Sequence, residues 1–312
     1  MYINKTISFR VILGFAWKNL FIFTILATLV CIVYLHYGVK QVAIPFLPLG
    51  TLGTAVAILL GFRNNSAYDR FWEARKIWGG IVNTSRSFAR QVTTFVTTQF
   101  AQGDMSEENA KTLQKELVYR HLAWLNALRL HLRREDLLNE TCWYELIHFI
   151  SEEELKEINL KQNKPTQLNQ LQGERLQYAR SVGLIDDFRH MELDRSLNVM
   201  YDLQGKCERI KNTPLPRQYA FFTKVFVWVF VCLLPFGFVD ILHWMTIPLA
   251  VLVSWIFTVL EQVGHYTEDP FSNGINDIPM TSMCRTIEID LREQLKETEL
   301  PKPLRAVNGV LM

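Results

Sequence analysis

The stretch from Val42 to Phe62 reads VAIPFLPLGTLGTAVAILLGF and contains no charged residue. A helix needs about 20 mainly apolar residues to cross the hydrocarbon core of a bilayer, so this stretch is long enough to do so. Three further stretches also lack charge: Leu20 to Leu35, Val225 to Val239 and Ile241 to Leu260. Four such stretches are too many for the core helices of a soluble protein of 312 residues. We therefore expect an all-α membrane protein with four transmembrane helices.

The average composition conceals this pattern. The chain is 49% hydrophobic, and its 33 Lys and Arg residues nearly balance its 31 Asp and Glu residues, for a net charge of +2. A nucleic-acid-binding protein would show a clear basic excess, so we expect no nucleic acid as a partner. The five cysteines form no CxxC pair, which argues against a zinc knuckle or a disulfide framework. Motifs of the P-loop, GxGxxG, HExxH and GxSxG types are absent from the sequence, which predicts neither an enzyme nor a cofactor.

The placement of basic residues predicts the orientation in the membrane. Between the first two stretches the only Lys or Arg is Lys40, and the last two have none between them. The positive-inside rule therefore puts both termini and the middle region in the cytoplasm. The predicted parts are a cytoplasmic N-terminal segment (1–19), transmembrane helices 1 and 2 (20–62), a helical cytoplasmic domain (63–218), transmembrane helices 3 and 4 (219–260) and a cytoplasmic C-terminal segment (261–312).

The middle region has the character of a helical domain. Ala110 to Leu130 carries apolar residues at helical spacing. Ser151, followed by Glu154, forms a capping box that predicts a helix start. The Gln- and Asn-rich run from Asn159 to Gln172 is interpreted as a surface loop.

Candidate metal ligands are few. Asp269, Asn276 and Asp277 lie in one oxygen-rich loop, but calcium takes six to eight oxygen ligands and this loop lacks a dense carboxylate cluster. Glu261 and His265 are one helical turn apart, and two ligands are too few for a metal site. We expect no bound metal, with the three loop residues as weak candidates only.

The stretch from Gly61 to Arg86, GFRNNSAYDRFWEARKIWGGIVNTSR, closely resembles the signature of the bestrophin family, in its bacterial branch with short cytoplasmic tails. Further matches are Gly205 to Pro216 (GKCERIKNTPLP), Asp269–Phe271 (DPF), Asn276–Pro279 and Ile287–Leu291 (IEIDL). The resemblance implies a homopentamer of helical chains around one central pore, in a bacterial inner membrane. The anion-conducting members, such as chloride channels, are the best known in this family.

Three residues of the second stretch match the narrow hydrophobic neck of the family. Thr54, Ile58 and Phe62 recur at i, i+4 and i+8, on one face of a helix. Rings of apolar side chains can gate a pore by dewetting. Thr54 departs from the family, where a bulkier aliphatic residue is usual, and so makes the outermost ring more polar. The alternative for Ile58 and Phe62 is ordinary helix packing.

Leu215 matches the second constriction of the family, at the cytoplasmic exit. Pro214 and Pro216 flank it, and because proline fixes φ, the turn can hold this side chain rigidly. The alternative is a simple turn before the third span. Four signature residues are expected to pair and pack below the membrane and not to contact ions: Arg70, Trp72, Glu73 and Arg75.

The resemblance does not extend to calcium activation. Calcium-gated eukaryotic members use an acidic cluster after an NPF- or DPF-like motif. Here Asp269–Phe271 is followed by Ser272, Asn273, Gly274 and Ile275, so the acidic cluster is missing and we expect calcium-independent conduction.

The sequence thus favours a channel for small monovalent ions, with copies of the same chain and membrane lipid as partners. An apolar neck has no charge ring to select the sign of the ion. The alternative is a membrane-anchored scaffold or regulatory protein whose cytoplasmic helices bind a partner.

Overall fold

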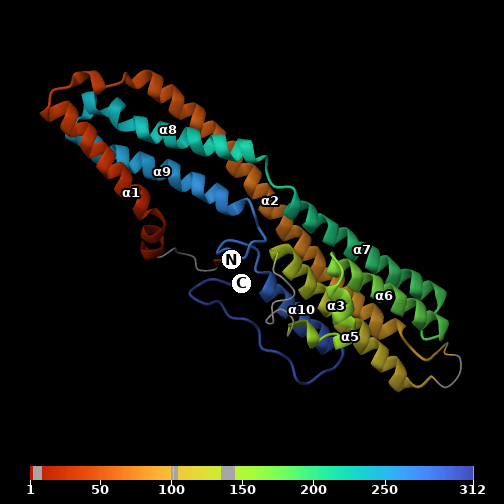
Figure 1. The fold of residues 1–312 in the computed structure, drawn as a ribbon. Coiled ribbons are helices and arrows are strands. Elements are labelled where there is room, and N and C mark those ends of the chain that lie inside the picture. Colours follow the sequence, from red (N-terminus) through yellow and green to blue (C-terminus); the bar gives the residue numbers. More distant parts are fainter. Residues whose placement is uncertain (3–8, 100, 102–104, 135–144, 312) are drawn as a thin grey trace. The chain divides into compact units, whose positions relative to one another are not determined.

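A computed structural model describes the chain except for residues 3–8, 100, 102–104, 135–144 and 312. Throughout the described residues the elements are helices, with two isolated β-bridges near the termini and no strand. This confirms the predicted helical class. The α-helices are α1 (Phe9–Cys31), α2 (Phe46–Phe95), α3 (Glu107–Arg133), α5 (Glu152–Asn159), α6 (Lys164–Ser181), α7 (Asp187–Asn212), α8 (Arg217–Leu242), α9 (Thr246–Thr267) and α10 (Met280–Gln294) (Figure 1).

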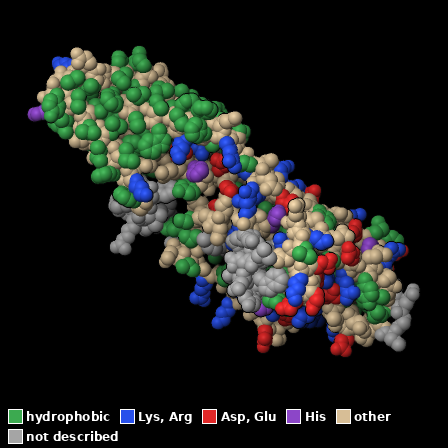
Figure 2. Space-filling view, in the orientation of Figure 1, with side chains coloured by type: hydrophobic (Ala, Val, Ile, Leu, Met, Phe, Trp, Pro, Cys, Tyr) green, Lys and Arg blue, Asp and Glu red, His purple; other side chains and the backbone are tan. Residues whose placement is uncertain are grey.

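The chain divides into two compact units. The apolar unit contains Asn4–Phe71 and Pro214–Asp269, and the polar unit contains Met1–Ile3, Trp72–Thr213 and Pro270–Met312. Hydrophobic side chains cover the visible face of α1, α8 and α9, whereas Lys, Arg, Asp and Glu side chains gather over the helices of the polar unit (Figure 2). The predicted boundary at residue 63 lies inside α2, which continues without a break to Phe95.

The apolar unit contains most of the membrane-type sequence. Its core includes Phe23 of α1, Leu60 of α2 and Phe230 of α8, while many large apolar side chains on the outer surfaces of its helices are exposed. Among the described residues, three segments are long and apolar enough to cross a membrane: Trp17–His36, Lys40–Phe95 and Arg217–Thr267. The last of these contains both α8 and α9, so a count of four spans requires each of those two helices to cross and stays a prediction.

The polar unit is built around α3. Nearly every residue of α3 from Leu117 to Leu132 is buried, because α6, α7 and α10 pack around this helix. His121 is fully buried, and its Nε2 lies 2.9 Å from the hydroxyl of Ser85. The same hydroxyl donates a hydrogen bond to the carbonyl of Ile81. Burial lowers the pKa of His121 to about 3, so this histidine is a neutral core residue at physiological pH.

The predicted helix start at Ser151 is confirmed, since its hydroxyl accepts a hydrogen bond from the amide of Glu154 at 3.2 Å. The predicted surface loop from Asn159 to Gln172 is wrong over most of its length. Asn163 caps α6, which begins at Lys164 with a proline in its first turn. Proline is well suited to the first helical turn, and the Gln- and Asn-rich composition concealed this signal.

Candidate functional site

The part of α2 within the apolar unit has two unlike faces. Val56, Leu60 and Arg63 are almost completely buried, whereas Ile58 is 54% exposed and Phe62 is 65% exposed. Thr54 is exposed on the same side as Ile58 and Phe62. The three predicted neck residues therefore lie together on one open face of a continuous helix, opposite the face that packs into the chain.

Local contacts explain the character of this open face. The Thr54 hydroxyl donates a hydrogen bond to the carbonyl of Gly50 at 3.0 Å, which satisfies the hydroxyl within its own helix. On the packed side, a Cβ added to Gly53 would lie 2.7 Å from the ring of Phe230. Glycine therefore allows α8 to approach α2 closely, and this contact holds the packed side of α2 inward.

Leu215 lies in the short connection between α7 and α8 and is half-buried. Pro216, which follows it, caps α8 with a φ of −51°. A few residues later, the hydroxyl of Tyr219 donates a hydrogen bond to the carbonyl of Leu59 at 3.4 Å, which ties the start of α8 to α2. Leu215 thus lies on a separate element from the three residues on the open face of α2.

The four signature residues fall in both units. In the apolar unit, the Arg70 Nε donates a hydrogen bond to the carbonyl of Glu268 at 2.8 Å. In the polar unit, Glu73 forms an ion pair with Arg209, with 2.6 Å between Oε1 and the guanidinium nitrogen. The side chains of Trp72 and Arg75 are exposed.

The weak metal candidates do not form a cluster. The carboxylate of the buried Asp277 accepts a hydrogen bond from the amide of Gly274 at 2.8 Å and so closes its own turn, while Asn276 is exposed. Asp269 belongs to the other unit. In the part of the chain that the structure describes, there is no group of three or more His, Cys, Asp or Glu residues that could hold a metal ion.

A buried ion pair in the apolar unit was missed by the sequence analysis. The guanidinium of Arg63 lies 3.0 Å from the carboxylate of Glu261. Glu261 therefore pairs with a distant arginine, and His265, one turn further on, is exposed. The available signal was that Arg63 and Glu261 each lie at the end of a long uncharged stretch, where a lone charge needs a partner.

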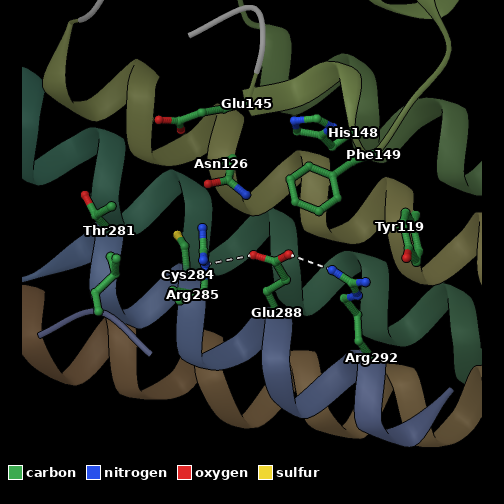
Figure 3. A pocket seen from close by; sticks show the side chains of 11 residues that line it. Tyr119, Asn126, Glu145, His148, Phe149, Thr281, Cys284, Arg285, Glu288 and Arg292 are labelled. Atoms are coloured by element: carbon green, nitrogen blue, oxygen red, sulfur yellow. Dashed lines mark hydrogen bonds and ion pairs between the residues drawn. The ribbon is translucent and has the colours of Figure 1, made fainter. Parts of the chain in front are cut away.

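The polar unit contains a pocket of about 380 Å³ between α3, α10 and the segment around His148 (Figure 3). The Glu288 carboxylate lies between two guanidinium groups of α10, 3.1 Å from Arg285 and 3.3 Å from Arg292. Arg292 also pairs with the carboxylate of Glu297, with 2.7 Å between Nε and Oε2. Burial raises the pKa of the Cys284 thiol at the wall of this pocket to about 11, so the thiol is protonated and a poor nucleophile at neutral pH.

The fold matches known membrane proteins. A crystal structure of a bacterial bestrophin homolog from Klebsiella pneumoniae superposes with a TM-score of 0.82 at 28% sequence identity, over 90% of this chain and 99% of that one. The helical fold and its apolar segments therefore define a membrane protein of the bestrophin type. Residues 5–293 match the family described as bacterial/fungal bestrophin protein, and the chain belongs to that family, as its signature predicts.

Curated relatives cover nearly the whole chain. The voltage-dependent anion channel-forming protein YneE of Escherichia coli (strain K12) is 33% identical over 281 residues, which is 90% of this chain and 86% of that protein. A protein of Ralstonia nicotianae, also named as voltage-dependent anion channel-forming, is 30% identical over 301 residues, or 94% of this chain and 93% of its own length.

Proposed function

We propose that five copies of this chain assemble in the bacterial inner membrane into a channel for small monovalent ions, with four spans in each chain and cytoplasmic termini. The observation that carries this proposal is the open face of α2, where Thr54, Ile58 and Phe62 are exposed opposite a tightly packed face. The names of the relatives from Escherichia coli and Ralstonia nicotianae support conduction.

Symmetry explains how one helix can line a pore. In a closed ring each chain presents the same surface, so five copies of the α2 face would surround a common axis. Ile58 and Phe62 would form narrow apolar rings that stay dry until they widen. The Thr54 ring would be less polar than its residue type suggests, because the hydroxyl is bonded to Gly50. Leu215 would form the cytoplasmic aperture.

The first test is the size of the assembly. Native mass spectrometry of the purified protein in mild detergent should show a single species of five 312-residue chains. A lone chain would leave the apolar side chains of Ile58 and Phe62 facing outward with no pore to enclose. A monomer that persists across several detergents and in lipid nanodiscs would contradict the proposed pore and favour a membrane-anchored scaffold.

We expect conduction to be independent of calcium. Asp277 uses its carboxylate to close its own turn, and no acidic cluster follows Asp269–Phe271 in the sequence. Bilayer currents should therefore agree within about two-fold with micromolar free calcium and with excess chelator, since calcium needs six to eight oxygen ligands. A strict requirement for micromolar calcium would contradict this expectation.

A further inference from the structure

The buried side of α2 carries a charge directly beside the open face. Arg63 is only 1% exposed. Its guanidinium contacts two carboxylates at the C-terminal end of α9, Glu261 at 3.0 Å and Glu268 at 3.6 Å. Glu261 is itself only 7% exposed. An arginine removed from water at the end of a membrane-type segment is costly unless it is paired. The position of Arg63 is therefore determined by these two carboxylates.

Two further contacts attach the same part of α2 to the same part of α9. The Asn64 side-chain amide donates a hydrogen bond to the carbonyl of Leu260 at 3.0 Å, and Arg70 donates to the carbonyl of Glu268. Gly264 lies against Asn64 so closely that a Cβ there would come within 2.0 Å of the Asn64 Oδ1. The absence of a side chain at Gly264 thus lets the two helices approach closely.

We call this set the helix latch: Arg63, Asn64 and Arg70 on α2, with Glu261, Gly264 and Glu268 at the C-terminal end of α9. A buried ion pair tolerates one rotational register, because turning either helix would leave a buried charge without its partner. Successive residues of a helix are about 100° apart, so fixing Arg63 inward fixes the direction of Phe62. Ile58 lies one helical turn before Phe62 on the same face, so its direction is fixed as well.

We propose that the helix latch positions the narrow neck of the pore, by holding Phe62 and Ile58 in one rotational register through the buried pair of Arg63 and Glu261. This inference rests on the proposed channel function. The latch residues are positioning residues: they lie where the packed side of α2 meets the end of α9, and they act on ions only through the open face.

The test compares one latch variant in two neck backgrounds. Glu261→Gln removes the charge and keeps the shape of the side chain. In the protein with the native neck, we expect Glu261→Gln to change the open probability at fixed voltage by at least about five-fold. This is the lower end of the range typical of coupling between two sites. The same substitution is then made in the protein that already carries Ile58→Ala and Phe62→Ala. There the open probability should stay within about two-fold of its value without Glu261→Gln, since the effects of coupled sites are not additive.

Two further variants separate positioning from folding. His265→Asn, at an exposed position one turn from Glu261, serves as the control. It should leave the open probability unchanged in both neck backgrounds. If Glu261→Gln fails to assemble, the pair Arg63→Met with Glu261→Leu replaces the buried charges by apolar side chains of similar volume, a change that proteins often tolerate. This apolar pair should assemble and still show the altered open probability.

The outcomes are distinguishable. An equal change in both neck backgrounds, or wild-type gating in the apolar pair, would overturn the latch and leave the channel proposal intact. Silence of the wild type and of the widened-neck protein would overturn the channel proposal itself, and the latch with it.

Discussion

Replacing Ile58 and Phe62 together by alanine should raise the single-channel current roughly ten-fold, which corresponds to removing about 1.4 kcal/mol from the barrier to ion passage. Both side chains are exposed on the open face of α2, so in the proposed pore their truncation should widen the narrowest apolar rings. A wider ring holds water more readily, and ions then cross without losing their hydration. Recordings of the purified protein in planar bilayers, at one voltage and salt concentration, provide the measurement.

The same helix offers a control. Val56 and Leu60 lie on its packed face and belong to the core of the apolar unit, so replacing both by alanine removes apolar volume, although less of it, from the opposite side. Truncating a buried leucine costs about 2–5 kcal/mol of stability, and this variant should unfold at lower temperature without any increase in unitary current. Equal currents through the two double variants would contradict a pore lined by the open face.

The second large effect is expected in the polar unit. Glu154 forms an ion pair with Arg120, with 2.6 Å between Oε1 and Nε, and Arg120 is largely buried. Removing one partner of a buried pair costs about 3–5 kcal/mol, and because Arg120 keeps its contact with Glu116, we expect Glu154→Gln to cost somewhat less, about 2 kcal/mol. Denaturant unfolding followed by circular dichroism measures this loss.

The control for this substitution lies on the same short helix. Glu152 pairs with Lys156 at 3.7 Å, and both side chains are mostly exposed. Exposed pairs contribute about 0–1 kcal/mol, so Glu152→Gln should have little effect. If both substitutions destabilise the protein equally, the cause is loss of negative charge at the start of α5 and not the buried contact with Arg120.

Acid should weaken the same network. Burial would raise the pKa of Glu116, but hydrogen bonds from Arg175 and Arg120 outweigh it and hold this pKa below its ordinary value. A carboxylate whose pKa is lower in the folded state than in the unfolded state stabilises the folded state at every pH above the unfolded-state pKa. Its contribution is therefore present at neutral pH and is lost as the pH falls through the folded pKa.

Local patterns predicted the parts of this molecule that depend on neighbours in sequence. The uncharged run from Val42 to Phe62 and the i, i+4, i+8 spacing of Thr54, Ile58 and Phe62 were enough to predict a helix with one distinctive face. The exposure of that face in the structure is consistent with the predicted neck, while its assignment to a pore comes from the family resemblance.

Contacts between distant residues could not be predicted in this way. Arg63 and Glu261 are 198 positions apart, and only the folded chain brings α9 against α2. The same holds for Tyr119, whose hydroxyl donates to the Glu297 carboxylate at 2.8 Å from 178 positions away. The misassigned loop before Gln172 is a different failure, because polar composition outweighed a valid helix start at Asn163.

The most direct test of the pore is a bilayer recording of the purified wild-type protein in symmetrical salt, followed by the variant with alanine at Ile58 and Phe62. The account predicts discrete current steps from the wild type and larger steps from the variant. Silence of both proteins, once pentamers have been shown to be inserted in the bilayer, would contradict the claim that this chain forms an ion channel.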